Sequence, residues 1–191
     1  MRRRRLLVVL GAVLGGTTYW TVGAREAGAD SLSFEVSIVN ERPTRAKPPV
    51  VRISVQNVDN EMHTIRIPNK GFPFATPLPD GAGAGRTIVL DERIPSNRNG
   101  DCWTGRGITL PASSEATLFP GEKRSDEYAV MTLTTDDETA ACWPPGSYTF
   151  TEHYGLDPEE SDSPGIEWGF TLAVDQDGSI EVDERDAEKI E

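Results

Sequence analysis

The fold is decided by residues 118–150, which read L-F-P-G-E-K-R-S-D-E-Y-A-V-M-T-L and, after a polar turn, C-W-P-P-G-S-Y-T-F. One Pro-Gly turn precedes the run 127–133, and a second precedes the run 147–150. Because a Pro-Gly turn does not lie inside a strand, each run is predicted to be a β-strand that starts after its turn. Cys142, one of only two cysteines, lies between the two strands.

Residues 1–29 have the pattern of an export signal or a membrane anchor. Four arginines follow Met1, and residues 6–24 carry no charged side chain. In one interpretation this is a signal with an apolar core at 6–16 that is cleaved after Ala27-Gly28-Ala29. In the other it is a retained transmembrane helix, because nineteen residues at about 1.5 Å each cover roughly 28 Å, close to the hydrocarbon thickness of a bilayer. Arg-Arg-x-Leu-Leu resembles a twin-arginine signal, but four arginines also satisfy the positive-inside rule. Both interpretations predict that residue 30 onward lies outside the cell membrane, either attached or secreted.

The rest of the chain is strongly acidic. The whole chain has 19 lysines and arginines against 31 aspartates and glutamates. Five arginines and one glutamate lie within residues 1–29, which leaves 14 basic and 30 acidic residues, a formal charge of −16. Such a surface repels nucleic acid and anionic lipid, so no nucleic-acid partner is expected. The carboxylate excess with only four lysines resembles proteins of salt-loving archaea, and it predicts a domain adapted to high salt.

Alternation of apolar and polar residues predicts most other strands. Leu32, Phe34, Val36 and Ile38 alternate with polar residues across 31–40, which is the period-two pattern of a strand with one wet face. Similar patterns or short apolar runs predict strands at 51–56, 62–67, 87–90, 108–110, 166–174 and 179–182. Two hairpins are expected, one across the turn 57–60 and one across Asp177-Gly178.

Eight or nine short strands with no amphipathic helix after residue 30 predict an all-β fold. The expected architecture is an immunoglobulin-like β-sandwich with an N-terminal transmembrane or signal helix. Tyr148, just after a turn at a strand start, is placed for a tyrosine corner. The predicted organisation is a signal peptide or membrane anchor at 1–29, a sandwich domain at 30–183 and a charged tail at 184–191, which is expected to fray.

Residues 68–86 form the least regular stretch and are rich in proline and glycine. A loop of about twenty residues is longer than a compact domain usually carries. It contains Phe72, Phe74 and Leu78. In one interpretation these side chains plug the open end of the sandwich. In the other they form an apolar contact for a protein partner at the cell surface.

Cys102 and Cys142 each precede a tryptophan and are predicted to form a disulfide, because an even cysteine count in an exported domain favours a bond. A redox or metal pair is the alternative, but neither cysteine has a further cysteine or histidine at ligand spacing. The only histidines are His63 and His153, which are expected to be surface or edge residues. A metal site that they share with a carboxylate is the weaker alternative.

No motif predicts catalysis or a cofactor. The chain contains no G-x-S-x-G, and its serines have no histidine at a recognisable family spacing. The glycine run 81–85 lacks the Gly-Lys-Ser/Thr of a phosphate loop, and the glycine of 175–178 comes too early for a calcium loop. We therefore expect no enzyme activity, no cofactor and no metal.

The arrangement L-F-P-G-E at 118–122, a strand with Tyr128, and P-G-S-Y-T-F at 145–150 resembles the closing half of immunoglobulin-like domains related to the intracellular proteinase inhibitor family of bacilli. The resemblance covers less than a third of the chain and implies the fold, without carrying over any functional residue. The expected function is an extracytoplasmic, membrane-anchored module with a binding or structural role. The alternative is a proteinase inhibitor that acts through the loop 68–86.

Overall fold

The computed structural model describes residues 29–67, 72–74, 78–82, 87–91, 98–99, 102–105, 113–133, 142–157 and 165–190. The predicted anchor or signal up to residue 28 and the predicted strand 108–110 lie outside these described residues. A 3-10 turn, η1 (Ala29–Ser31), opens the described chain. Within the described part, no helix is long and apolar enough to cross a membrane.

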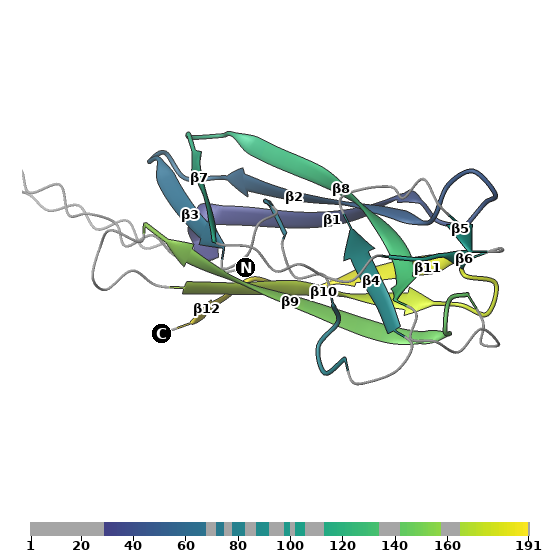
Figure 1. Ribbon diagram of the computed structural model, residues 1–191. Helices are drawn as coiled ribbons and strands as arrows, with labels where there is room; N and C mark the ends of the chain where they lie inside the picture. The colour runs from purple at the N-terminus through teal and green to yellow at the C-terminus, as the bar shows by residue number, and fades with distance from the viewer. Residues whose placement is uncertain are drawn as a thin grey trace, which may run out of the picture.

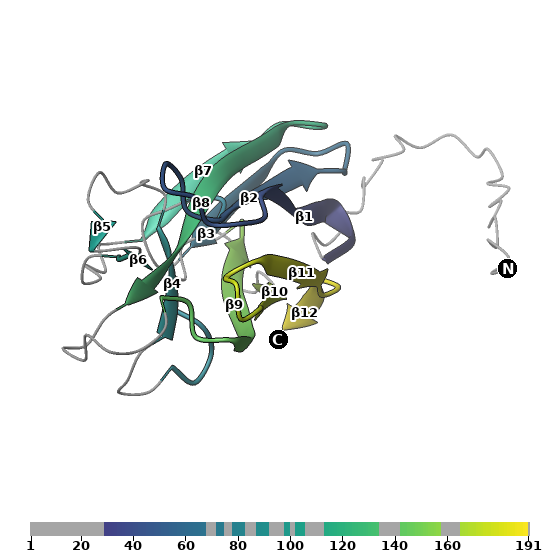
Figure 2. The same cartoon turned by 90° about the vertical axis from the view of Figure 1, so that its right-hand side faces the viewer.

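Two antiparallel sheets pack as a sandwich, which confirms the predicted all-β class (Figure 1). The first sheet has the spatial order β1 (Leu32–Asn40), β2 (Val50–Asn57), β8 (Lys123–Leu133), β4 (Thr87–Asp91). The second has the order β11 (Ile180–Glu184), β10 (Gly165–Val174), β9 (Gly146–Leu156), β3 (His63–Ile67), β7 (Ser114–Leu118), with β12 (Glu188–Ile190) also paired to β10. A separate pair consists of β5 (Arg98–Asn99) and β6 (Cys102–Trp103). β1 and β2 lie above β10 and β11 in this view and in the view turned by 90° (Figure 2).

The alternation predicted for residues 31–40 builds one face of the first sheet. Leu32, Phe34 and Val36 on β1 are buried, whereas Glu35 is exposed. β1 pairs with β2 in antiparallel register, with Phe34 opposite Val55. The apolar side of this pair therefore faces the second sheet, as a period-two pattern requires.

The hairpin predicted across residues 57–60 is wrong. The chain turns there, but β2 pairs with β1 and β8, whereas β3 pairs with β7 and β9. The turn thus carries the chain from one sheet to the other. The buried side chain of Asn57 fixes this crossing, because its Nδ2 donates to the carbonyl oxygens of Glu61 at 2.7 Å and Leu118 at 3.0 Å.

Residues 118–150 contribute to both sheets. β8 and β9 each have eleven residues, so both are longer than the predicted runs. The hairpin predicted across Asp177-Gly178 is confirmed, with Val174 of β10 opposite Ile180 of β11. Gly178 has a φ of 79°, a left-handed conformation that glycine adopts without steric cost.

The C-terminal tail does not fray as predicted, because β12 pairs with the start of β10 and places Ile190 opposite Gly165. A Cβ atom on Gly165 would lie 2.7 Å from Ile190 Cγ1, so the glycine leaves the space that Ile190 fills. The β12–β10 pairing rests on backbone hydrogen bonds and one apolar side chain. The mostly charged sequence of the tail gives no sign of this pairing.

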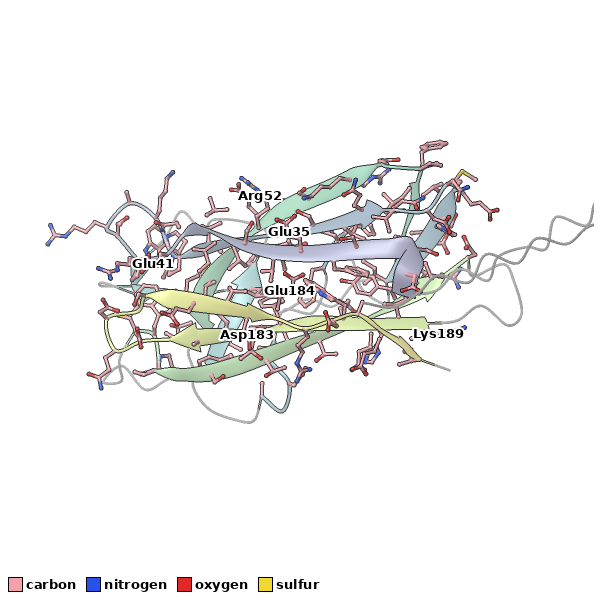
Figure 3. The ribbon with its side chains drawn as sticks, turned by 180° about the vertical axis from the view of Figure 1, so that it is seen from behind. Glu35, Glu41, Arg52, Asp183, Glu184 and Lys189 are labelled. Carbon is pink, nitrogen blue, oxygen red and sulfur yellow. A yellow bond between two sulfur atoms is a disulfide. The ribbon has the colours of Figure 1, made fainter. Side chains whose placement is uncertain are left out.

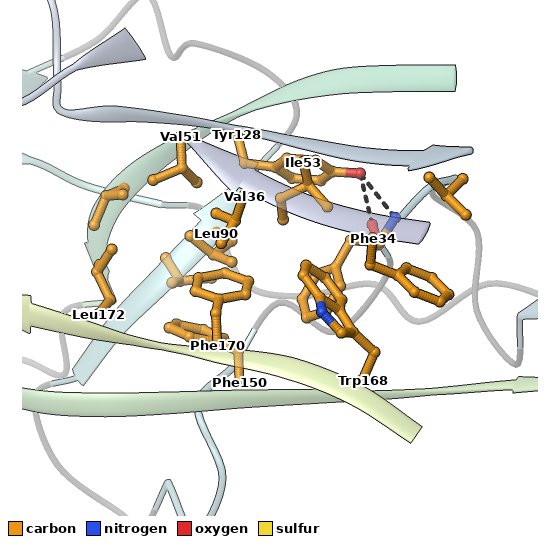
Figure 4. Packing of buried hydrophobic residues seen from close by; sticks show 14 of the residues in the cluster. Phe34, Val36, Val51, Ile53, Leu90, Tyr128, Phe150, Trp168, Phe170 and Leu172 are labelled. Atoms are coloured by element: carbon orange, nitrogen blue, oxygen red, sulfur yellow. Dashed lines mark hydrogen bonds between the residues drawn. The ribbon is translucent and has the colours of Figure 1, made fainter. Parts of the chain in front are cut away.

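Aromatic side chains fill the space between the sheets (Figure 4). Trp168 of β10 stacks on Phe34 of β1 with 5.1 Å between ring centroids. Phe74 enters this core from the loop 68–86. Its backbone N–H donates to the Tyr128 hydroxyl oxygen at 3.1 Å, and the Tyr128 hydroxyl donates to its carbonyl oxygen at 2.8 Å. The Tyr154 hydroxyl donates to the carbonyl oxygen of Pro73 at 3.0 Å. The core therefore holds the described centre of the long loop in place.

Candidate functional site

The two ends of the sandwich gather different residues from several loops. The near end, where the described chain begins, comprises η1, the β2–β3 turn at 58–62 and the β7–β8 turn at 119–122. The disulfide end comprises the β1–β2 loop at 41–49, the Cys102–Cys142 bond and the β10–β11 turn at 175–179. β1 runs from the near end toward β5 and β6, so the two groups lie at opposite ends of the sandwich (Figure 1).

Asn57 joins the two turns of the near end. Besides the two carbonyl bonds described above, its Oδ1 accepts from the backbone N–H of Asp59 at 3.0 Å. Its backbone N–H donates to the carbonyl oxygen of Glu122 at 3.0 Å, and its own carbonyl oxygen accepts from the N–H of Gly121 at 2.9 Å. The β2–β3 and β7–β8 turns are therefore one hydrogen-bonded unit.

A buried histidine lies beside this unit, between two aspartates. His63 Nδ1 is 3.0 Å from Asp157 Oδ2, and His63 Nε2 is 3.5 Å from Asp59 Oδ2. The His63 side chain is 3% exposed, so the prediction that it is a surface or edge residue is wrong. The buried ring and the two aspartates beside it brace the turn. The sequence gives no signal for the contact with Asp157, which is 94 residues away.

Hydrogen bonds lower the pKa of two carboxyl groups at the near end. The pKa of Asp59 is lowered chiefly by the backbone N–H of Asn60, 2.7 Å from Asp59 Oδ1, although burial opposes the shift. The pKa of Glu122 is lowered first by the backbone N–H of Phe119 at 2.9 Å and then by Arg124. Both turns are thus held by ionised carboxylates.

The second histidine, His153, is exposed on β9, with Nδ1 3.6 Å from Glu167 Oε2. In the β3–β9 register Ile65 lies opposite Leu156. His63 precedes Ile65 by two residues, and His153 precedes Leu156 by three. Because the two strands are antiparallel, the histidines lie on opposite sides of this pair, and the structure does not bring them together. Among the described residues, no group of three or more histidine, cysteine, aspartate or glutamate side chains is arranged to hold a metal ion.

The predicted disulfide is confirmed at the other end of the sandwich. The Cα atoms of Cys102 and Cys142 are 4.9 Å apart, and the bond joins positions separated by 40 residues. Closing a loop of this length stabilises the folded state by roughly 4 kcal/mol in the chain-entropy model. The bond ties the short β5–β6 pair to the segment that leads into β9.

The two tryptophans that follow the cysteines close the disulfide end. Trp103 is 5% exposed, and its Nε1–H donates to the carbonyl oxygen of Thr44 in the β1–β2 loop at 3.1 Å. Trp143 is 6% exposed and packs with Pro43 around Gly178, where a Cβ atom would lie 3.1 Å from Trp143 Cε3 and 3.0 Å from Pro43 Cγ. In each Cys-Trp pair, the cysteine contributes to the one disulfide and the tryptophan contributes a buried ring.

The predicted contact residues of the loop 68–86 occupy different environments. Phe74 is 1% exposed and belongs to the core, whereas Phe72 and Leu78 are half-buried and pack against it. The N–H of Asp80 donates to the carbonyl oxygen of Thr149 on β9 at 2.7 Å. These positions fit the interpretation that the loop plugs the sandwich. The Phe74 side chain is not available to a partner in this structure.

Acidic residues line the side where β1 contacts β11 (Figure 3). Glu35 extends from β1, and Asp183 and Glu184 extend from β11. Burial raises the pKa of Glu184, and the nearby carboxylates of Glu35 and Asp186 raise it further, against a hydrogen bond with the Val36 backbone. This edge therefore carries several carboxylates, of which Glu35 pairs with Lys123 at 2.5 Å.

No family model matches the chain, and no curated protein matches it.

Proposed function

We propose that the protein is a membrane-anchored, extracytoplasmic module that binds a protein at the cell surface or has a structural role, without catalysing a reaction. The observation that carries this proposal is the disulfide, because such bonds persist in oxidising compartments. The bond lies at the end of the sandwich opposite to Ala29, where the described chain begins. A retained segment at 6–24, preceded by four arginines, would keep the N-terminus in the cytoplasm and the disulfide end farthest from the bilayer.

An immunoglobulin-like topology is part of this proposal. The order β1-β2-β8-β4 corresponds to strands A, B, E and D of that fold, and β10-β9-β3 corresponds to G, F and C. The Tyr148 hydroxyl donates to the carbonyl oxygen of Pro144 at 2.8 Å, which is the bond expected of a tyrosine corner at the start of strand F. Two features differ from the immunoglobulin pattern: β7 follows β4 in the chain, and the disulfide does not join strands B and F.

Three observations favour a scaffold over the two other classes of function. A proteinase inhibitor acting through the loop 68–86 needs exposed apolar residues; residues 80–82 are exposed, but Phe74 is in the core and Leu78 packs against it. A catalytic role for His63 needs an accessible ring, but the side chain is 3% exposed. The disulfide end, with Trp103 and Trp143 buried beneath its loops, is a rigid platform on which exposed loop residues can meet a partner.

Adaptation to high salt is the remaining part of the proposal. A charge of −16 over residues 30–191 produces self-repulsion, which dissolved salt screens. The raised pKa of Glu184 on the β1–β11 edge comes chiefly from burial, and the carboxylates of Glu35 and Asp186 add to it. The folded domain should therefore be more stable at high ionic strength.

Mass measurement of the intact protein from its native membrane tests the proposed function. We expect the protein to sediment with membranes, to resist a carbonate wash, and to retain residue 1 or 2 with both cysteines oxidised. Recovery of a soluble protein that begins near Asp30 would show cleavage after Ala27-Gly28-Ala29 and would contradict the anchor. Two free thiols in the native protein would contradict the extracytoplasmic assignment.

A further inference from the structure

We propose that the near end of the sandwich makes a second contact with the lipid bilayer, through the exposed side chains of Val58, Met62 and Phe119. We refer to these three residues as the apolar tip. The inference rests on the proposed membrane anchor and adds a lipid-binding surface on the folded domain.

The apolar tip contains most of the large hydrophobic side chains that the described surface exposes. Val58 is 54% exposed, Met62 56% and Phe119 61%. Ile38 and Val39, at 38% and 44%, are the other large exposed hydrophobics among the described residues, and they lie toward the opposite end of β1. Single exposed apolar residues are common, whereas a cluster on adjacent turns marks an interaction surface.

Backbone pairing and hydrogen bonds hold the three residues on adjacent turns. His63 lies opposite Leu118 in the β3–β7 register, so Met62 and Phe119 follow as the next pair along these two segments. Asn57 precedes Val58, and its Nδ2 donates to the carbonyl oxygens of Glu61 and Leu118, the residues before Met62 and Phe119. The tip is therefore a preformed surface, and placing it in the bilayer does not require these turns to fold first.

The chain enters the sandwich beside the apolar tip. The backbone N–H of Val58 donates to the carbonyl oxygen of Ser31, in the first described turn, at 2.9 Å. Only five Cα–Cα steps separate Ala24, the last residue of the uncharged segment, from Ala29, and they span at most about 18 Å. β8 alone, with eleven residues, is about 34 Å long. The short tether therefore keeps the near end close to the bilayer and allows the disulfide end to lie far from it.

The charges around the tip fit a shallow contact with a zwitterionic membrane surface. Asp59 is beside His63, and Glu122 pairs with Arg124 at 3.0 Å, so these carboxylates have partners within the domain. Glu61 is exposed. The domain as a whole repels anionic lipid, so the attraction must come from the apolar side chains reaching the acyl boundary.

Lipid exposure of single introduced cysteines tests the contact. The full chain carrying Val58→Cys, Met62→Cys or Phe119→Cys is labelled with an environment-sensitive thiol dye and reconstituted in phosphatidylcholine vesicles. The native cysteines are bonded and do not react. Val39→Cys is the matched control, because Val39 is an exposed valine toward the other end. We expect the dye at the tip to shift its emission to the blue and to be quenched by a spin label attached high on the lipid chains. The dye at residue 39 should show neither effect.

A second substitution separates lipid contact from local packing. In the labelled Val58→Cys chain, Phe119→Asp should reduce quenching by the lipid spin label, and Phe119→Leu should preserve it. Ile38→Asp, the matched change away from the tip, should leave the signal unchanged.

Each other outcome overturns the inference in a distinguishable way. If the chain sediments with the vesicles but the dye at the tip behaves like the dye at residue 39, the anchor stands and the lipid contact is wrong. If the chain stays in the supernatant, both the anchor and the lipid contact are wrong. A blue shift without quenching by lipid would show that the tip is buried against protein, such as a second copy of the chain.

Discussion

The disulfide end and the near end of the sandwich are closed by different chemistry. The disulfide end has a covalent cross-link and buries Trp103 and Trp143 next to it. The near end depends on the amide of Asn57 and on the ionised carboxylates of Asp59 and Glu122. A covalent bond does not respond to pH or salt, whereas hydrogen bonds to carboxylates do. The two ends should therefore unfold under different conditions, and the difference can be measured.

Removal of the cross-link is expected to have the largest effect. Replacing both residues, Cys102→Ser with Cys142→Ser, should cost roughly 4 kcal/mol, because the unfolded chain regains the entropy of a closed loop. For a domain of this size the melting temperature would fall by about 8–16 °C. Thermal unfolding of the variant and of the reduced wild type should agree with each other. Unchanged melting in both would show that the bond does not support this end.

Removal of the near-end amide should come next. Asn57→Ala leaves two carbonyl oxygens and one N–H without their partner, which should cost about 3 kcal/mol in denaturant unfolding. Asn60→Ala in the same turn is the control, because Asn60 is exposed, and it should change stability by less than about 0.5 kcal/mol. Equal losses in the two variants would contradict the role given to Asn57.

The turn that begins at Asn57 also shows which parts of the fold can be predicted from the sequence. This turn was predictable, because three of residues 57–60 are asparagine or aspartate, which favour turns, and the stretch lies between two apolar runs. The partner strands were not, because a turn signal does not distinguish a hairpin from a crossing between sheets. The β10–β11 hairpin was predictable, since Asp-Gly selects a tight turn.

The candidate site was less predictable than the fold. The disulfide follows from an even cysteine count in a chain that is expected to be exported, and Phe74 was expected in the core under one interpretation of its loop. The burial of His63 depends on Asp157, a contact across 94 residues that leaves no pattern in the sequence. The apolar tip was equally hidden, because Val58, Met62 and Phe119 are unremarkable singly and become a surface only when Asn57 brings their turns together.

Acid should loosen the near end before the disulfide end. The folded-state pKa values of Asp59 and Glu122 lie below their unfolded values, so their stabilisation is present above about pH 4 and is lost as the pH falls through the folded values. Amide exchange protection at residues 58–62 and 119–122, measured relative to the intrinsic exchange rate at each pH, should therefore fall in acid. The pKa of Asp177 at the other end is also lowered, by Ser179, but the Cys102–Cys142 bond remains. Earlier loss of protection at 102–105 and 142–145 would contradict this order.

Removing one charge from the acidic edge should change the stability least among these substitutions. The folded-state pKa of Glu184 is raised, so its ionised form opposes folding as the pH rises, and Glu184→Gln should stabilise the domain slightly at neutral pH and low salt. Glu181→Gln, on the same strand, is the control for the change in charge alone.

Potassium chloride from about 0.1 to 1 M shortens the Debye length from about 10 to about 3 Å. It should raise the melting temperature of the wild type and reduce the advantage of Glu184→Gln. A flat or falling melting temperature would contradict the adaptation to salt.

The height of each end above the bilayer tests the central claim most directly. Energy transfer to acceptor-labelled lipids can be measured from a dye at Val58→Cys and from a dye at Lys47→Cys, in the full chain reconstituted in vesicles. Lys47 is exposed in the β1–β2 loop, at the disulfide end. We predict strong transfer from residue 58 and much weaker transfer from residue 47, because the sandwich extends roughly 34 Å along β8. Equal transfer from the two positions, or stronger transfer from residue 47, would contradict a domain whose near end faces the membrane and whose disulfide end faces outward.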